Sequence, residues 1–222
     1  MPRESYQERL DALRDDVLYM SELAAGQVRD ALDALARTDA ELARQVIDGD
    51  EELNQLYLEL ESDCVDLLAL QQPVAGDLRF IASSFKIITD LERIGDLATN
   101  LAEYAMDAEE TVFPDVDVQR IGELALDHLD QATTAYATED TELCHDVAAA
   151  DDEVDRLCTE ASESIVRELV SQSDDDRDAD VLLSEVSRLF LTIRDLERVG
   201  DHAVNIAARA LYMVENDDAL LY

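Results

Sequence analysis

Two stretches of the chain, 105 residues apart, are nearly the same: residues 90–100 are DLERIGDLATN and residues 195–205 are DLERVGDHAVN. Eight of the eleven positions are identical, and one of the three differences exchanges Ile for Val. A second block agrees further upstream, where DEELNQL at residues 50–56 aligns with DDEVDRL at residues 151–157. Self-similarity over both halves of a chain is typical of a duplicated structural unit.

The apolar residues around these blocks have the spacing of helices. In the first segment they recur in steps of three and four, at Leu10, Leu13, Val17, Met20, Ala24, Val28, Ala31 and Leu35. This periodicity predicts an amphipathic helix. A chain with only 6 Gly and 3 Pro has little of the turn chemistry that a β protein needs. The sequence therefore predicts an all-α protein.

Helix-capping residues divide the rest of the chain. A second helix is predicted from a capping box at residues 38–41 to residues 71–72, and a third from a first turn containing Pro73 to about Ala108. After an interruption at residues 111–114 the pattern begins again. It predicts three more helices, at about residues 117–136, 141–172 and 181–214. An acidic loop is predicted at residues 171–180, between the last two helices.

The predicted fold is a tandem repeat of two antiparallel three-helix bundles related by pseudo-twofold symmetry. Each of the six long helices is expected to span about 25–35 residues, a length that buries its apolar stripe only against neighbouring helices. The expected domains are residues 1–112 and residues 113–222.

The net charge of −37 excludes several functional classes. A nucleic-acid binder or an anionic-membrane binder needs a basic stripe, and the sequence has none. Lys86 is the only lysine beside 16 arginines, and Asp outnumbers Glu by 32 to 22. This composition predicts a surface adapted to high salt, where screening weakens the repulsion among carboxylates.

Three further observations predict a cytoplasmic protein. The cysteines Cys64, Cys144 and Cys158 form no CxxC pair and are odd in number, so reduced thiols fit better than a disulfide framework. The N-terminal residues lack the apolar run of a signal peptide. No stretch approaches 18 consecutive apolar residues, so no direct insertion into a membrane is expected.

The repeated block carries two matched pairs of acids. Glu92 and Asp96 are four residues apart, as are Glu197 and Asp201, so each pair lies on one face of its helix. With 54 acidic residues, chance alone gives many such pairs, and these two stand out because they recur at the same positions of the repeat. A helical projection puts them at the margin of the buried stripe, where like charges need a compensating cation.

Carboxylates of this kind, with Asn100 and Asn205 continuing each series, are hard oxygen ligands that suit Mg, Ca, Mn or iron. Two other interpretations stay open. Arg93 and Arg198 could pair with acids three residues away in a purely structural ion-pair ladder, or the acids could form a solvated face.

The sequence gives little support for catalysis. GxxxxGK[ST], GxSxG and HExxH are absent, so the common hydrolase chemistries lack their residues. Glu-x-x-His occurs once, at residues 142–145, whereas a ferritin-like di-iron site needs it on two helices. His202 replaces Leu97 inside the motif and is interpreted as a core or surface histidine. The absence of these motifs predicts a protein that is not an enzyme.

Three stretches together resemble one family. They are QQPVAGDLR at residues 71–79, DLERIGD at residues 90–96 followed by Asn100, and DLERVGDHAVNIA at residues 195–207. At these residues the sequence resembles the PhoU family of phosphate-uptake regulators, and the resemblance covers both repeats in order. The second half departs from the family pattern because no QxP…DLR stretch precedes its motif.

This resemblance implies a metal-binding cytoplasmic regulator of phosphate uptake and phosphate homeostasis. The alternatives are a metal-dependent carboxylate-site enzyme, and a structural helical scaffold or regulator for another ion transporter. The implied metal ligands are Glu92, Asp96, Glu197 and Asp201, with iron as the implied metal and Mn, Mg or Ca as alternatives. The implied partners are the ATPase subunit of a phosphate ABC transporter, which the family regulates negatively, and a sensor kinase or other regulator. A homodimer is also implied.

Overall fold

The computed structural model describes residues 3–70, 73–107, 116–171 and 179–221, and within them the only regular secondary structure is α-helix. The six helices are α1 (Arg3–Arg37), α2 (Ala40–Leu70), α3 (Ala75–Met106), α4 (Val118–Thr138), α5 (Thr141–Ser171) and α6 (Ala179–Glu215). The predicted all-α class is confirmed. No described helix has the length and apolar character needed to cross a membrane.

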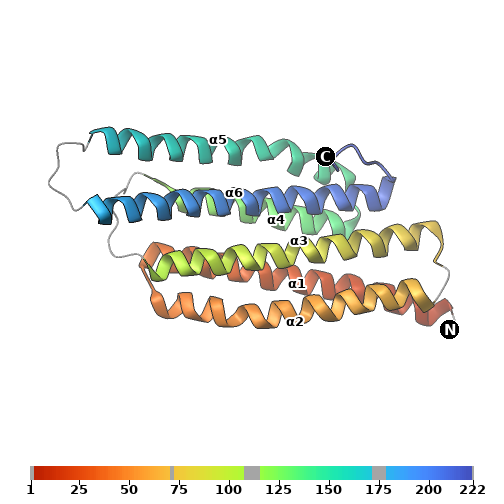
Figure 1. The fold of residues 1–222 in the computed structure, drawn as a ribbon. Helices are drawn as coiled ribbons and strands as arrows, with labels where there is room; N and C mark the ends of the chain where they lie inside the picture. The colour runs from red at the N-terminus through yellow and green to blue at the C-terminus, as the bar shows by residue number, and fades with distance from the viewer. Residues whose placement is uncertain (1–2, 71–72, 108–115, 172–178, 222) are drawn as a thin grey trace.

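The helices form two elongated bundles that lie side by side (Figure 1). α1, α2 and α3 pack together in the first bundle, and α4, α5 and α6 in the second. The bundles meet through α3 against α6 and, less extensively, α1 against α4, while α2 and α5 lie on the outside. α3 and α6 run antiparallel, the arrangement that a pseudo-twofold axis perpendicular to the helices produces. The predicted boundary between residues 112 and 113 lies outside the described residues and stays a prediction.

The two bundles use the same short turn between their first and second helices. Thr38 and Glu139, 101 residues apart, both adopt left-handed backbone conformations, with φ of 52° and 59°. The next residue in each turn, Asp39 or Asp140, accepts a hydrogen bond of 3.1 Å from the backbone N–H three residues later. The predicted capping box was therefore wrong in its first residue, because Asp39 and not Thr38 caps α2.

Three helix ends differ modestly from the prediction. α3 begins at Ala75 with Val74 as its N-cap, so Pro73 precedes the helix instead of lying in its first turn. α4 has 21 residues, close to its predicted range of 117–136 although shorter than the general expectation of about 25–35. It begins after Asp117, whose side chain accepts a hydrogen bond from the backbone N–H of Arg120. α6 has 37 residues and starts inside the stretch predicted to be a loop.

The predicted stripe of α3 is buried. Its members are Ser84, Ile88, Leu91, Gly95, Ala98 and Ala102. Full burial of one Leu or Ile side chain stabilises the fold by about 1.5–3 kcal/mol. Ser84 also shares a buried hydrogen bond of 2.7 Å with Tyr136 of α4, which links the two bundles. The three cysteines are free and buried, in agreement with the prediction of reduced thiols.

Candidate metal centres and the seam between the repeats

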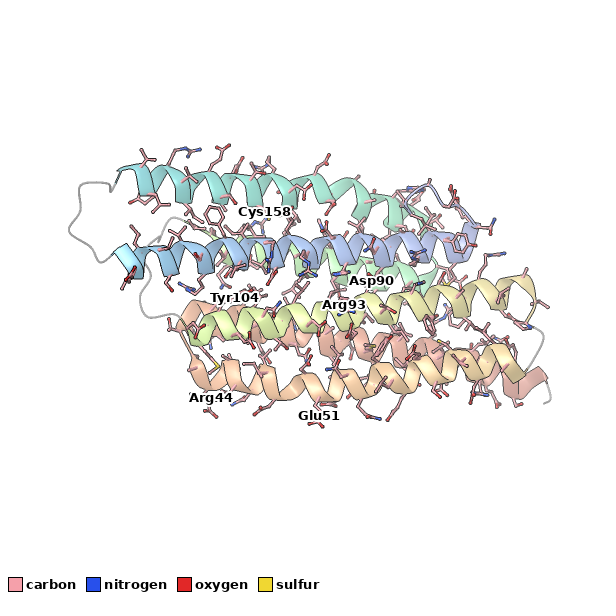
Figure 2. All side chains as sticks on the ribbon, viewed as in Figure 1. Arg44, Glu51, Asp90, Arg93, Tyr104 and Cys158 are labelled. Atoms are coloured by element: carbon pink, nitrogen blue, oxygen red, sulfur yellow. The ribbon has the colours of Figure 1, made fainter. Side chains whose placement is uncertain are left out.

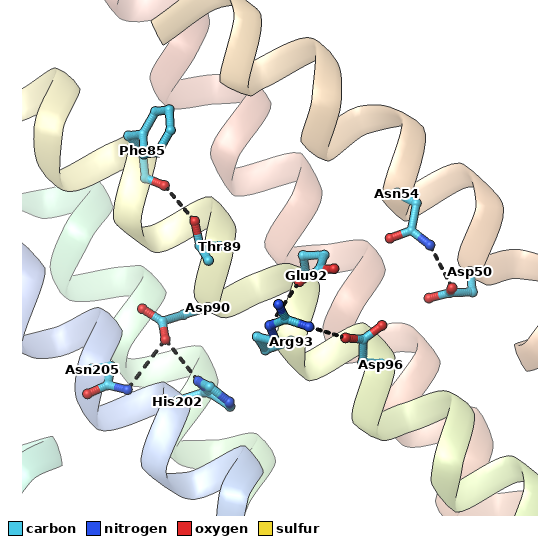
Figure 3. A network of polar contacts seen from close by, with 10 residues as sticks. All are labelled: Asp50, Asn54, Phe85, Thr89, Asp90, Glu92, Arg93, Asp96, His202 and Asn205. Carbon is cyan, nitrogen blue, oxygen red and sulfur yellow. Dashed lines mark hydrogen bonds and ion pairs between the residues drawn. The ribbon is translucent and has the colours of Figure 1, made fainter. Parts of the chain in front are cut away.

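The first-half cluster consists of Asp50 on α2 and of Glu92 and Asp96 on α3, and all three residues are half-buried. The pKa of Asp50 is raised, mainly by burial and then by the charge of Asp96, although the side chains of Asn54 and Thr99 partly oppose this. Burial and the charge of Asp96 also raise the pKa of Glu92. The structure thus places both predicted ligands of the first half near a third carboxylate (Figure 3).

Arg93 compensates part of this charge. Its Nη1 lies 2.8 Å from Asp96 Oδ2, and its Nε lies 3.4 Å from Glu92 Oε2. The guanidinium therefore bridges both predicted ligands on the surface of α3 (Figure 3). The contact with Asp96 is the one expected from an ion-pair ladder, whereas Asp90, the other expected partner of Arg93, makes its contacts elsewhere.

Two oxygens beside this cluster are buried and accept no hydrogen bond from any described residue: Asp50 Oδ1 and Gln27 Oε1 of α1. Both lie near Gly95, at 3.6 and 3.2 Å from the point that a Cβ would occupy there. A methyl group of Leu53 lies closer still, at 2.2 Å from the same point, so Gly95 also permits tight helix packing. Unpaired buried oxygens are costly, and a hard cation is one of the groups that satisfies them.

The second-half cluster consists of Asp151 and Asp155 on α5 and of Glu197 and Asp201 on α6. None of these four carboxylates makes a hydrogen bond or ion pair with the part of the chain that the structure describes. Burial, followed by the charges of Asp155 and Asp201, raises the pKa of Asp151 to about 6. Burial and the charge of Asp155 likewise raise the pKa values of Glu197 and Asp201, although the charges of His202 and Arg198 partly oppose the rise at Asp201.

The conformations in the structure do not by themselves form a coordination sphere. Within the described ranges, no group of three or more His, Cys, Asp or Glu side chains is arranged to hold an ion. The fit to a metal rests on the donor set, which is carboxylate oxygen in both halves, and, in the first half, on the orphaned carboxylate and amide oxygens beside Gly95. Glu92 and Asp96 would hold an ion in the first half, and Glu197 and Asp201 in the second.

The carboxylates of α2 and α5 were missed at the sequence level. Asp50 aligns with Asp151, and Asn54 with Asp155, at the same offset of 101 residues and with the same spacing of four. This recurrence was visible in the aligned block, and it is the same signal that singled out the pairs on α3 and α6. Because the chain has many other acidic residues, this recurrence is recognised only when the two halves are compared.

A second group of polar residues forms the seam, the polar contact between α3 and α6. Asp90 of α3 lies 2.8 Å from His202 Nδ1 and accepts a hydrogen bond of 3.4 Å from Asn205, both on α6. Figure 2 shows Asp90 and Tyr104 along the space between the two bundles, whereas Glu51 points away from α2. His202, expected in the core or on the surface, thus joins the two repeats.

The other half of the seam is its pseudo-symmetric counterpart. Asp195 is completely buried and accepts hydrogen bonds from Asn100 at 3.3 Å and from Tyr104 at 2.9 Å, both on α3. Arg194 and Arg198 of its own helix lie 2.7 and 3.7 Å away. Asn100 and Asn205 were expected to support a metal. The structure instead places both as donors to aspartates of the opposite repeat.

The fold and the site define a class of protein: a tandem three-helix-bundle protein with one carboxylate cluster per repeat and a reciprocal polar seam. The PhoU domain matches the chain twice, at residues 17–105 and 118–210. The chain belongs to the PhoU family.

Individual relatives are similar along nearly the whole chain. The Phosphate-specific transport system accessory protein PhoU homolog of Pseudomonas putida is 38% identical over 218 residues, which is 97% of this chain and 82% of that protein. Among solved structures, PhoU from Pseudomonas aeruginosa has a TM-score of 0.88 at 35% identity, covering 96% of this chain and 100% of that one. The phosphate transport system regulatory protein PhoU from Streptococcus pneumoniae has a TM-score of 0.85 at 26% identity, covering 96% and 98%.

Proposed function

We propose that this protein is an accessory protein of phosphate transport that negatively regulates a phosphate ABC transporter and phosphate-responsive signalling. The observation that carries the proposal is the match of both repeats to the PhoU domain, together with relatives named as phosphate-specific transport system accessory proteins. Its partners would be the transporter's ATPase subunit, a sensor kinase or another regulator. The family is one of accessory and regulatory proteins, so the proposed role is docking and not catalysis. Such partners require it to work in the cytoplasm.

Deletion of the gene tests this role. Without the protein, phosphate uptake and phosphate-responsive gene expression should stay high when phosphate is abundant, and a plasmid copy of the gene should restore repression. Unchanged uptake and unchanged expression in the deletion strain would contradict the regulatory role. Sedimentation of the purified protein tests the homodimer, which a mass of 24.7 kDa in solution would exclude.

The proposed docking-competent form contains metal. Glu92 and Asp96 in the first half, and Glu197 and Asp201 in the second, would hold the ions, with Asp50 or Asp151 contributed by the neighbouring helix. Because each cluster draws carboxylates from two helices, a bound cation would crosslink them and stabilise the bundle by mass action. Iron is the proposed metal; Mn, Mg and Ca have the same preference for oxygen ligands.

Metal content and metal-dependent stability provide the test. Protein purified without chelator and without a nickel column should contain metal by elemental analysis, and adding Fe²⁺ or Mn²⁺ to metal-free protein should raise its melting temperature. Asp201→Asn should reduce both effects, whereas Asp152→Asn, an exposed neighbouring acid, should leave them unchanged. A metal-free preparation whose melting temperature ignores both ions would remove the metal from the proposal while leaving the regulatory role standing.

A further inference from the structure

We propose that the two carboxylate clusters bind divalent cations with unequal affinity, and that the second-half cluster fills first because Arg93 already neutralises the first. This inference rests on the metal binding proposed above and concerns its order. The two clusters occupy matching positions of the repeat, so any difference between them reflects the few residues that differ or that turn in different directions.

The first-half cluster carries its own cation. Arg93 contacts Asp96 at 2.8 Å and Glu92 at 3.4 Å, and Asn54 donates a hydrogen bond of 2.7 Å to Asp50 Oδ2. Each carboxylate of this cluster thus has a partner within the protein. An incoming cation must displace the guanidinium, which is about half exposed and free to move aside.

The second-half cluster has no arginine in ion-pair contact with any of its four carboxylates, although the charges of His202 and Arg198 reach Asp201 from farther away. Asp155 stands where the first half has Asn54, so a fourth carboxylate replaces the amide donor. Arg198 stands where the first half has Arg93, but its nearest carboxylate is Asp195, at 3.7 Å, and not Glu197 or Asp201. Unpaired, partly desolvated carboxylates repel one another until a cation binds, so this cluster gains more from binding.

The seam explains why the two arginines turn in different directions. Asp90 is satisfied across the seam by His202, which leaves Arg93 free to lie over Glu92 and Asp96. The counterpart of Asp90 is Asp195, and on α3 the position equivalent to His202 holds the apolar Leu97. With no histidine opposite it, the fully buried Asp195 accepts hydrogen bonds from Asn100 and Tyr104 through one oxygen, while Arg194 and Arg198 of its own helix lie beside the other. Two differences between the repeats therefore underlie the asymmetry: His202 in place of Leu97, and Arg194 in place of Thr89.

Titration of the metal-free, full-length protein with Mn²⁺, followed by calorimetry and by the electron paramagnetic resonance of free Mn²⁺, tests the order. The wild type should show two steps of different affinity. Asp201→Asn should remove the tighter step and Asp96→Asn the weaker one. Two steps of equal affinity, or loss of the tighter step in Asp96→Asn, would overturn the inference and leave the proposed metal binding intact. No binding at all would overturn both.

The matched arginines isolate the cause. Arg93→Gln should tighten the weaker step about tenfold, because two exposed ion pairs no longer compete with the metal. Arg198→Gln should change the tighter step less than threefold. His202→Leu should also tighten the weaker step, since Arg93 is then needed by Asp90, and this variant changes no proposed ligand. Circular dichroism melts confirm that each variant is folded. Equal effects of Arg93→Gln and Arg198→Gln on their own steps would refute the role of Arg93.

Discussion

Asp151→Asn should stabilise the metal-free protein at neutral pH. The pKa of Asp151 is raised from 3.8 to about 6 by burial and by neighbouring carboxylates. One pKa unit corresponds to about 1.36 kcal/mol, so two units set an upper limit of about 3 kcal/mol. Because Asp151 is only about half buried, solvent screening reduces the expected gain to about 1 kcal/mol.

The sign of the effect fixes its pH dependence. A carboxyl group whose pKa is raised in the folded state binds its proton more tightly there than in the unfolded chain. Its ionisation therefore lowers the stability of the folded state. This destabilisation is complete above about pH 6 and decreases progressively as the pH falls towards 3.8. The gain from Asp151→Asn should be present at pH 7.5 and should shrink markedly at pH 4.8.

Urea unfolding followed by circular dichroism, in buffer containing a chelator, measures this gain at both pH values. Asp152→Asn removes the same formal charge from an exposed neighbouring position and serves as the control. A gain that is equal at pH 7.5 and 4.8, or equal in the two variants, would refute the argument. It would mean that the general charge of −37, and not the local cluster, raises the free energy of the folded state.

Gly200→Ala should stabilise the protein by up to about 1 kcal/mol, since the new methyl group would lie 3.4 Å from Val154. Gly95→Ala should destabilise it by about 1–2 kcal/mol, because a methyl group of Leu53 lies only 2.2 Å from the position of the new Cβ. Thermal unfolding compares the two variants, and equal shifts in melting temperature would contradict the difference in packing. Asp195→Ala should cost about 3 kcal/mol in urea unfolding, because it removes a fully buried acceptor of the seam, and a loss below 1 kcal/mol would show that the seam contributes little. Gln27→Glu places a second carboxylate beside the orphaned Asp50 Oδ1. It should therefore lower the melting temperature in the presence of chelator and enlarge the rise in melting temperature on adding Mn²⁺. A change in only one of these two measurements would argue against an ion in the first-half cluster.

Most of the fold could be predicted from the sequence because the information is periodic and duplicated. Steps of three and four place the buried stripe of α3 correctly, and the repeated motif predicts two bundles. The predicted helix ends were less accurate at Thr38 and Pro73. At both places two neighbouring residues could serve as the N-cap, and only the backbone conformation shows which of them does.

The polar contacts were predicted less completely for a different reason. Periodicity shows which residues share a face of one helix, but not which helix lies opposite that face. Glu92 and Asp96 could therefore be found on α3, while the approach of Asp50 from α2 could not. Asn100 and Asn205 continue the same acidic series, yet both lie on the side of the helix that meets the other bundle, where they act as donors.

The reciprocal seam also has an evolutionary consequence. Asn100 of the first repeat donates to Asp195 of the second, and Asn205 of the second donates to Asp90 of the first. A contact that each copy makes to the other in the same way is one that a single three-helix ancestor could have made to a second copy of itself. Fusion of two such chains would have freed each half to change alone, as the single histidine in the seam already has.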